Sequence, residues 1–176
     1  MVKKDELISA FDTSIKMEEE GRAFYIKAAG RSKNEFGKRV FEALADDETR
    51  HIAAIKKFCE VMAKKDETPE LCVAMPRHKK INDRLIFGKS KHELLKRVKP
   101  SADELKAYEI AMGMENDGYD FYKKIEEGTK DPNAKELYKF LLSEEEAHFD
   151  LISSTYEYLK DPKSWFAKEE KPIVEG

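Results

Sequence analysis

The stretch MEEEGRAFY at residues 17–25 returns as MENDGYDFY at residues 114–122, an offset of 97 positions. A second pair of stretches keeps the same offset, since DETRH at residues 47–51 aligns with EEEAH at residues 144–148. A single register therefore relates all four stretches. The second half of the chain is predicted to repeat the structure of the first half.

Proline positions and helix-capping residues predict four long helices. The six prolines leave long proline-free runs, and these are the runs that can form helices. Gly30 is expected to end the first helix in a left-handed conformation. Capping boxes at residues 32–35 and 101–104 are expected to begin the second and third helices, and Asp131 followed by Pro132 the fourth. The predicted helices are residues 5–30, 32–64, 101–128 and 131–160.

The lengths of the connections predict how these helices are arranged. Only a few residues join the first helix to the second and the third to the fourth, so each pair is expected to form an antiparallel hairpin. About 36 residues, from 66 to 101, separate the hairpins, which suits the long crossover of a four-helix bundle. We therefore predict an all-α four-helix bundle over residues 1–162 and a tail at 163–176 that can form a short helix.

Composition excludes several classes of protein. The chain has 176 residues, 40% of them hydrophobic, which is enough apolar material for a folded core. A formal net charge of −3 argues against a dedicated nucleic-acid binder. The two cysteines, Cys59 and Cys72, form no CxxC pair and cannot build a disulfide framework or a thiolate-only metal site, and Cys59 is expected to act as a small buried hydrophobe. With no apolar run long enough to span a bilayer, a cytoplasmic protein without membrane contact is expected.

Helical periodicity indicates which polar side chains point inward. In the first helix Phe11, Glu18 and Tyr25 are seven residues apart and lie nearly in one line, flanked by Ile8 and Ile15. The other three helices carry apolar residues at intervals of three and four, and polar residues interrupt each of these stripes near its middle. The interrupting residues are Glu48 and His51 in the second helix, Glu115 in the third, and Glu145 and His148 in the fourth.

Four carboxylates that face one interior require a positive partner, because each buried charge costs several kcal/mol and their mutual repulsion adds to that cost. Two divalent cations would balance the four charges. In each Glu-x-x-His pair the (i, i+3) spacing places both side chains on one helical face, so both can reach the same metal. Oxygen and imidazole donors without thiolate suit iron or manganese, and zinc can occupy such sites. The predicted metal ligands are Glu18, Glu48, His51, Glu115, Glu145 and His148.

Two Glu-x-x-His motifs in register with two Glu-x6-Tyr motifs resemble the ferritin-like di-iron carboxylate proteins, closest to the rubrerythrin-like branch, over about residues 5–160. The resemblance implies a ferritin-like bundle with two iron ions. It also implies that Glu18 and Glu115 are mainly terminal ligands, that Glu48 and Glu145 bridge, and that each histidine binds one iron.

The sequence departs from rubrerythrins proper at two points. Those proteins carry an extra glutamate one turn after the ligand of the third helix, where this chain has Gly118. They also append a rubredoxin domain with four iron-binding cysteines, which the two cysteines here cannot supply. The resemblance therefore implies an external electron donor, such as a rubredoxin.

Several residues around the predicted ligands have two readings. Tyr25 and Tyr122 can hydrogen-bond ligand carboxylates, mediate electron transfer, or be core tyrosines with satisfied hydroxyls. Asp47 and Glu144 stand four residues before each histidine and can accept its free ring N–H, or lie on a solvated face. Gly21 and Gly118 leave room beside the metals, or simply reflect duplication. Acids that mostly fall off the core stripes are expected at the surface: Glu19, Glu20, Glu42, Glu144 and Glu146.

Three hypotheses for the function follow. The first is a non-heme di-iron oxidoreductase that reduces hydrogen peroxide or dioxygen with electrons from an external donor, working as a homo-oligomer, with a dimer favoured. The second is a ferroxidase or iron-handling protein, in which Fe(II) itself supplies the electrons. The third belongs to a different class, a metal-free helical interaction protein, and predicts that chelators leave the thermal stability unchanged.

Overall fold

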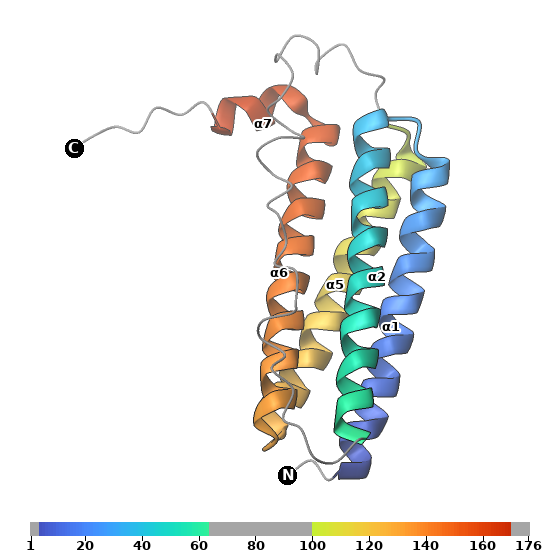
Figure 1. Ribbon diagram of the computed structural model, residues 1–176. Coiled ribbons are helices and arrows are strands. Elements are labelled where there is room, and N and C mark those ends of the chain that lie inside the picture. The colour runs from blue at the N-terminus through green and yellow to red at the C-terminus, as the bar shows by residue number, and fades with distance from the viewer. Residues whose placement is uncertain (1–3, 64–99, 170–176) are drawn as a thin grey trace, which may run out of the picture.

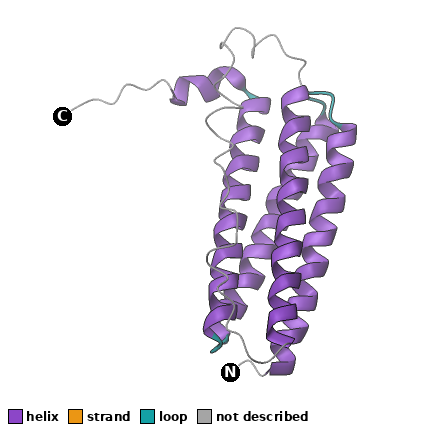
Figure 2. Cartoon of the chain, in the orientation of Figure 1, coloured by secondary structure: helices purple, strands orange, loops and turns teal. Residues whose placement is uncertain are grey.

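The computed structural model describes residues 4–63 and 100–169. All regular structure in these two ranges is α-helical, which confirms the predicted all-α class (Figure 2). None of the described helices combines the length and the apolar character that crossing a bilayer requires. The helices are α1 Lys4–Arg31, α2 Glu35–Ala63, α5 Ala102–Gly128, α6 Pro132–Lys160 and α7 Pro162–Glu169.

The four long helices lie side by side as a bundle of two antiparallel hairpins, α1 with α2 and α5 with α6 (Figure 1). Helix α2 ends at the lower end of the bundle in Figure 1, whereas α5 begins at the upper end. These two helices therefore run in the same direction, which is the arrangement that a long crossover produces. Almost all of the predicted crossover, including Cys72, lies outside the described residues.

The predicted starts of α5 and α6 are confirmed by their capping side chains. Ser101 Oγ accepts a hydrogen bond of 3.2 Å from the backbone N–H of Glu104. Asp131 Oδ1 accepts one of 2.8 Å from the N–H of Ala134, and Pro132 occupies the first turn, where its missing N–H leaves no bond unmade. The second hairpin therefore begins each helix where the local sequence predicts it.

The prediction for the link between α1 and α2 is wrong in two respects. Helix α1 continues one residue past Gly30, whose φ does not lie in the left-handed range. Asn34 caps α2 in place of the predicted box at 32–35, because its Oδ1 accepts two backbone N–H bonds of 3.0 and 3.1 Å from the first turn. Ser32 instead donates its hydroxyl to the Glu104 carboxylate, which ties the two hairpins together.

The apolar core is divided into two clusters by a polar layer at mid-height. The predicted stripes of α2 and α6 are confirmed, since their residues are buried or, for Met62, half-buried. The two clusters are built around Tyr25, Phe41, Leu44, Tyr108 and Ile152, and around Phe11, Ile55, Phe58, Tyr138 and Leu141. The layer between them is the place where the predicted metal ligands meet.

The predicted inward position of Ile8 is wrong, because its side chain is 51% exposed. Leu7, Phe11 and Ser14 are buried and lead to Glu18 at spacings of four, three and four, so they form the inward face of this part of α1. Ile8 follows Leu7 by one residue and is therefore turned by about 100° from that face.

Helix α7 extends sideways from the upper end of α6 and packs two aromatic side chains against it (Figure 1). The buried rings of Trp165 and Phe166 meet the ring of Tyr158 edge-on, with centroids 5.6 and 6.0 Å away. The indole N–H of Trp165 donates to Ser154 Oγ at 3.3 Å. The apolar rings of α7 thus extend the core formed by the four long helices.

Cys59 has a free, half-buried thiol beside the cluster that contains Phe58. Burial, and after it the charge of Asp12, raises the pKa of this thiol. The residue therefore behaves as a protonated, apolar side chain, in line with its predicted role.

Candidate metal centre

The structure brings together all six side chains that the sequence predicts as metal ligands. They lie at mid-height in the bundle, with between 0% and 6% of each residue exposed. Each hairpin contributes one glutamate from its first helix and a Glu-x-x-His pair from its second, because one register relates the two hairpins. The contributions are Glu18 from α1, Glu48 and His51 from α2, Glu115 from α5, and Glu145 and His148 from α6.

The six donors form two groups of three. In each group one ligand atom per residue can be chosen so that the three atoms all lie within 4.8 Å of one another. Two carboxylates and one imidazole make up each group, a donor set that suits iron, manganese or zinc. The groups are Glu18, His51 and Glu145, and Glu48, Glu115 and His148.

Two of the carboxylates face both groups. Glu48 Oε2 lies 3.4 Å from Nδ1 of His51, and its Oε1 lies 3.6 Å from Nδ1 of His148. Glu145 belongs to the group of His51, yet it stands three residues before His148 of the other group, on the same face of α6. Glu48 and Glu145 therefore lie between the two groups, and the bridging role that the resemblance implies for them stays a prediction.

Both histidines direct Nδ1 toward the carboxylates and Nε2 toward an acid of the opposite hairpin. His51 Nε2 lies 3.5 Å from Glu144 Oε2 on α6, and His148 Nε2 lies 3.5 Å from Asp47 Oδ2 on α2. The sequence predicted each acid as the partner of the histidine in its own helix, and this pairing is wrong. The imidazoles reach across the bundle, where the approximate two-fold relation of the hairpins places the other acid.

The burial of these two acids also differs from one of the predictions. Glu144 was expected at the surface as an acid outside the core stripe, but it is only 7% exposed, and Asp47 is 1% exposed. An acid that accepts the Nε2 proton leaves the Nδ1 lone pair directed at the site where a metal would bind.

The two tyrosines show the same exchange between hairpins. Tyr25 of α1 donates its hydroxyl to Glu115 of α5, and Tyr122 of α5 donates to Glu18 of α1. Burial, and after it the charge of the carboxylate that each contacts, raises the pKa of both phenols. Each tyrosine therefore remains a proton donor that orients one predicted ligand, and its hydroxyl is satisfied by that ligand.

Comparison with known proteins assigns the chain to a family. The sequence profile of the rubrerythrin family matches residues 10–156, which is most of the chain. The chain belongs to the rubrerythrin family. No protein with a curated description matches the chain, so this comparison assigns no activity to it.

Two solved structures resemble this rubrerythrin-family chain. A hypothetical protein from Pyrococcus furiosus is 25% identical, with a TM-score of 0.62 over 88% of this chain and 90% of the other. A two-domain protein from Anabaena variabilis, with DJ-1/ThiJ/PfpI-like and ferritin-like domains, is 13% identical with a TM-score of 0.61. The second match covers 99% of this chain but 40% of the other, and it shows the ferritin-like fold alone.

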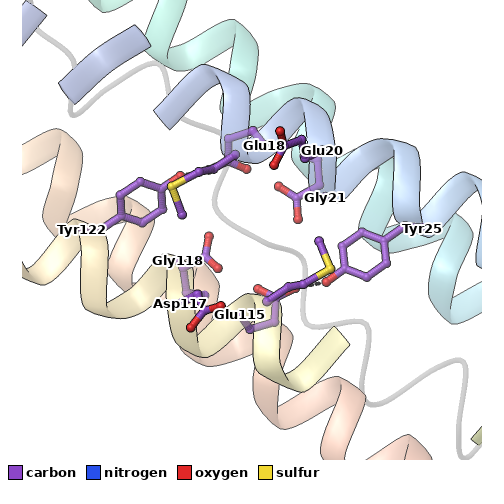
Figure 3. Close-up of a pocket in the computed structure, with 12 residues that line it drawn as sticks. Glu18, Glu20, Gly21, Tyr25, Glu115, Asp117, Gly118 and Tyr122 are labelled. Atoms are coloured by element: carbon purple, nitrogen blue, oxygen red, sulfur yellow. Dashed lines mark hydrogen bonds between the residues drawn. The ribbon is translucent and has the colours of Figure 1, made fainter. Parts of the chain in front are cut away.

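A pocket of about 170 Å³ lies between α1 and α5 and reaches the carboxylates of the centre (Figure 3). Gly21 of α1 and Gly118 of α5 line it. A Cβ atom on Gly21 would meet Glu48 Cδ at 3.6 Å, and one on Gly118 would meet Glu145 Oε2 at 2.8 Å. Because these glycines have no side chain, the carboxylates of Glu48 and Glu145 can lie close to α1 and α5. This favours the interpretation that the glycines leave room beside the predicted metal site. At Gly118, where rubrerythrins proper carry an extra glutamate, the Glu145 carboxylate occupies the adjacent space.

The electrostatics of this rubrerythrin-type site fit two divalent cations. Burial raises the pKa of Glu48 and Glu145, and the charges of Glu18 and Glu115 respectively raise it further. Burial also acts against ionisation of Glu18 and His51, but their mutual attraction prevails and moves the pKa of Glu18 to about 2 and that of His51 to about 10. Buried carboxyls that raise one another's pKa lack sufficient positive charge nearby, and two divalent cations would supply it.

Proposed function

We propose that this protein is a non-heme di-iron oxidoreductase that reduces hydrogen peroxide or dioxygen with electrons from an external donor. The observation that carries the proposal is the pair of shared carboxylates, Glu48 and Glu145, between two groups that each contain a histidine. A shared carboxylate makes two metal sites act as one unit. We assign the role of metal ligand to Glu18, Glu48, His51, Glu115, Glu145 and His148.

The chemistry follows from what such a centre requires. Two iron ions, when bound, supply the two-electron change needed to reduce peroxide to water. The chain supplies the surroundings: two apolar clusters exclude water from either side, and the pocket between α1 and α5 admits a small oxidant. Tyr25 and Tyr122 hold two of the carboxylates in place. Glu144 and Asp47 lie 3.5 Å from the Nε2 atoms of His51 and His148, where they favour one orientation of each ring.

The electron donor, the oligomer and the compartment belong to the same proposal. We propose that a separate protein such as a rubredoxin supplies the electrons. The two cysteines of these 176 residues cannot themselves form a four-cysteine rubredoxin site. We propose a cytoplasmic homodimer. Light scattering gives the oligomer size, and NAD(P)H-coupled peroxide turnover through added rubredoxin tests the donor.

Ferroxidase activity is the second candidate, in which Fe(II) is oxidised as the substrate. A further pocket between α5 and α6, with exposed acids at its rim, favours this candidate because negative charge attracts Fe(II). Iron-dependent oxygen uptake that leaves a ferric mineral in a 24-subunit shell would support it over peroxide turnover by a dimer.

Metal analysis followed by stopped-flow mixing tests the proposal. We expect about two metal ions per chain and rapid oxidation of the diferrous protein by one of the two oxidants, peroxide or dioxygen, mixed in separate experiments. Glu48→Gln should remove this reaction, whereas Glu42→Gln, an exposed acid on the same helix, should not. Unchanged thermal stability on chelation, together with benign Glu48→Ala and Glu145→Ala variants, would indicate the metal-free interaction protein instead.

A further inference from the structure

We propose that divalent cations reach the centre through the pocket between α5 and α6, where Glu146 and Asp150 draw them inward. The proposal rests on the proposed function, because it takes the six-residue centre as the destination of the ions. It separates the route of the metal from the route of the oxidant, which enters between α1 and α5.

The pocket between α5 and α6 connects the surface with the centre. It has a volume of about 360 Å³ and is lined at the surface by the exposed residues Asn116, Glu146 and Asp150. Its inner lining includes the carboxylates of Glu115 and Glu145, which are 3% and 6% exposed. These two residues belong to different metal groups, so a cation that passes the rim meets ligands of both.

The surroundings of Glu145 favour binding of a cation in this pocket. Glu145 lines the pocket and is only 6% exposed, and Glu18 lies beside it in its group of three. The charges of Glu115, Glu18 and Glu48 all act against ionisation of its carboxyl. No tyrosine hydroxyl donates to it in the described part of the chain, in contrast to Glu18 and Glu115. A buried carboxylate in this position gains most from a positively charged ligand.

The first hairpin has a side-chain hydrogen bond between its helices at the equivalent place. Arg22 Nε on α1 donates to Thr49 Oγ1 on α2 at 2.9 Å, so a side-chain latch spans the two helices. The repeat replaces Arg22 by Tyr119 and Thr49 by Glu146. The latch is therefore lost in the second hairpin, and an acid takes its place.

The second hairpin is also more negatively charged at this place than the first. The five positions of the first hairpin that align with the rim and walls of the pocket carry Glu19 and Arg22, a net charge of zero. The aligned positions of the second hairpin carry Glu146 and Asp150, a net charge of −2. Lys123 is the nearby cation, and it lies 5.7 Å from the centroid of the Tyr119 ring. A concave surface with excess negative charge raises the local concentration of cations and their rate of association.

The pocket between α1 and α5 has a different lining. Met17 and Met114 contribute thioethers, and the two glycines contribute no side chain. Besides four carboxylates of the centre, its lining has two exposed acids, Glu20 and Asp117. Glu20 is ion-paired with Lys16 at 3.8 Å, so these two acids and Lys16 carry a net charge of −1, against −2 at the rim of the α5–α6 pocket. The comparison favours the α5–α6 pocket as the cation route.

Metal uptake by the apoprotein tests the route. Co²⁺ is the probe, because its coordination is followed by visible absorbance in a stopped-flow instrument. Measurements at ionic strengths of about 0.01 and 1 M change the Debye length from about 30 to about 3 Å. Two variants neutralise equal charge at the two pockets, Glu146→Gln with Asp150→Asn and Glu20→Gln with Asp117→Asn. A third, Tyr119→Arg with Glu146→Thr, transplants the latch of the first hairpin.

We expect the Glu146→Gln/Asp150→Asn variant to take up Co²⁺ about tenfold more slowly at low ionic strength and about twofold more slowly at high ionic strength. The final absorbance should match that of the wild type, which shows an intact centre. The variant with the transplanted latch should be slow at both ionic strengths, and the Glu20→Gln/Asp117→Asn variant should stay within about twofold of the wild-type rate.

Two results would overturn the proposed route alone: wild-type uptake by the Glu146→Gln/Asp150→Asn variant, or equal slowing by the variant of the other pocket. A wild-type protein that binds no Co²⁺ would overturn the route together with the proposed function. Two bound ions with indistinguishable uptake rates would leave the proposed function standing and reject the route.

Discussion

The two glycines beside the shared carboxylates provide a matched pair of substitutions with different expected outcomes. A Cβ at Gly21 would make an ordinary contact of 3.6 Å with Glu48 Cδ. A Cβ at Gly118 would come within 2.8 Å of Glu145 Oε2 and 3.2 Å of its Cδ, so the carboxylate must move. Both positions lie in helix interiors, where replacing Gly by Ala contributes about 1 kcal/mol of stability.

We expect Gly21→Ala to raise the melting temperature of the apoprotein by about 2 to 4 °C. Gly118→Ala should do the same, because the end of the Glu145 side chain is able to shift. The metal-bound proteins should differ: the Gly118→Ala variant should bind Co²⁺ about 10 to 100 times more weakly, because a shared ligand is displaced. Each tenfold loss of affinity removes about 1.4 kcal/mol of the stabilisation that excess metal provides.

Calorimetric melting with and without Co²⁺, together with a binding titration, measures both quantities. The reasoning would be refuted if Gly118→Ala kept the full metal-dependent rise in melting temperature. It would also be refuted if Gly21→Ala lost as much affinity as Gly118→Ala, because the difference between 2.8 and 3.6 Å would then have no consequence.

Three further predictions concern a tyrosine, the pH and the core. Tyr122→Phe removes the hydroxyl that donates to Glu18, so Co²⁺ should bind about tenfold more weakly in titrations. Tyr138→Phe, whose hydroxyl contacts Ser14 rather than a ligand, is the control and should bind normally. Because the pKa of His51 is raised from 6.5 to about 10, this group stabilises the apoprotein fully below pH 6.5 and loses that effect as the pH rises to about 10. Denaturant titrations should therefore show a falling free energy of unfolding over this range, while Co²⁺ affinity rises because fewer protons compete; a flat profile would count against the charge pattern. Leu44→Ala, at a fully buried position, should cost about 2 to 5 kcal/mol of stability in the same titrations, and a loss below about 1 kcal/mol would contradict the packing described for this cluster.

The six residues that meet at mid-height could be predicted from sequence because two independent regularities select them. Spacings of three and four residues place Glu48 and His51 on the inward face of α2, and the offset of 97 residues selects their counterparts in α6. Both regularities are local or internal to the chain. No knowledge of how the helices pack is needed to see that these acids share one interior.

The errors have a common physical origin in contacts between the two hairpins. Ser32 reads as a helix cap, but the Glu104 carboxylate of the other hairpin accepts its hydroxyl, and Asn34 becomes the cap. Asp47 reads as a partner of the histidine in its own helix, but His148 of the other hairpin lies beside it. The local sequence gives no information about how closely the two hairpins pack. It therefore cannot show whether a side chain contacts the other hairpin or a neighbour in its own helix.

The repeat itself nevertheless contains a signal for the crosswise contacts. If two copies of one hairpin pack about an approximate two-fold axis, a contact from the first copy to the second must be matched by its reverse. The hydroxyl of Tyr25 on Glu115 is matched in this way by that of Tyr122 on Glu18. A hairpin that supplied its own second layer of hydrogen bonds would be complete without its copy. In this chain each hairpin provides the groups that orient the predicted ligands of the other, so the six side chains come together only when both hairpins have packed. Positions where the two copies differ, such as Arg22 and Tyr119, then mark the places where one side of the centre has acquired a property that the other lacks.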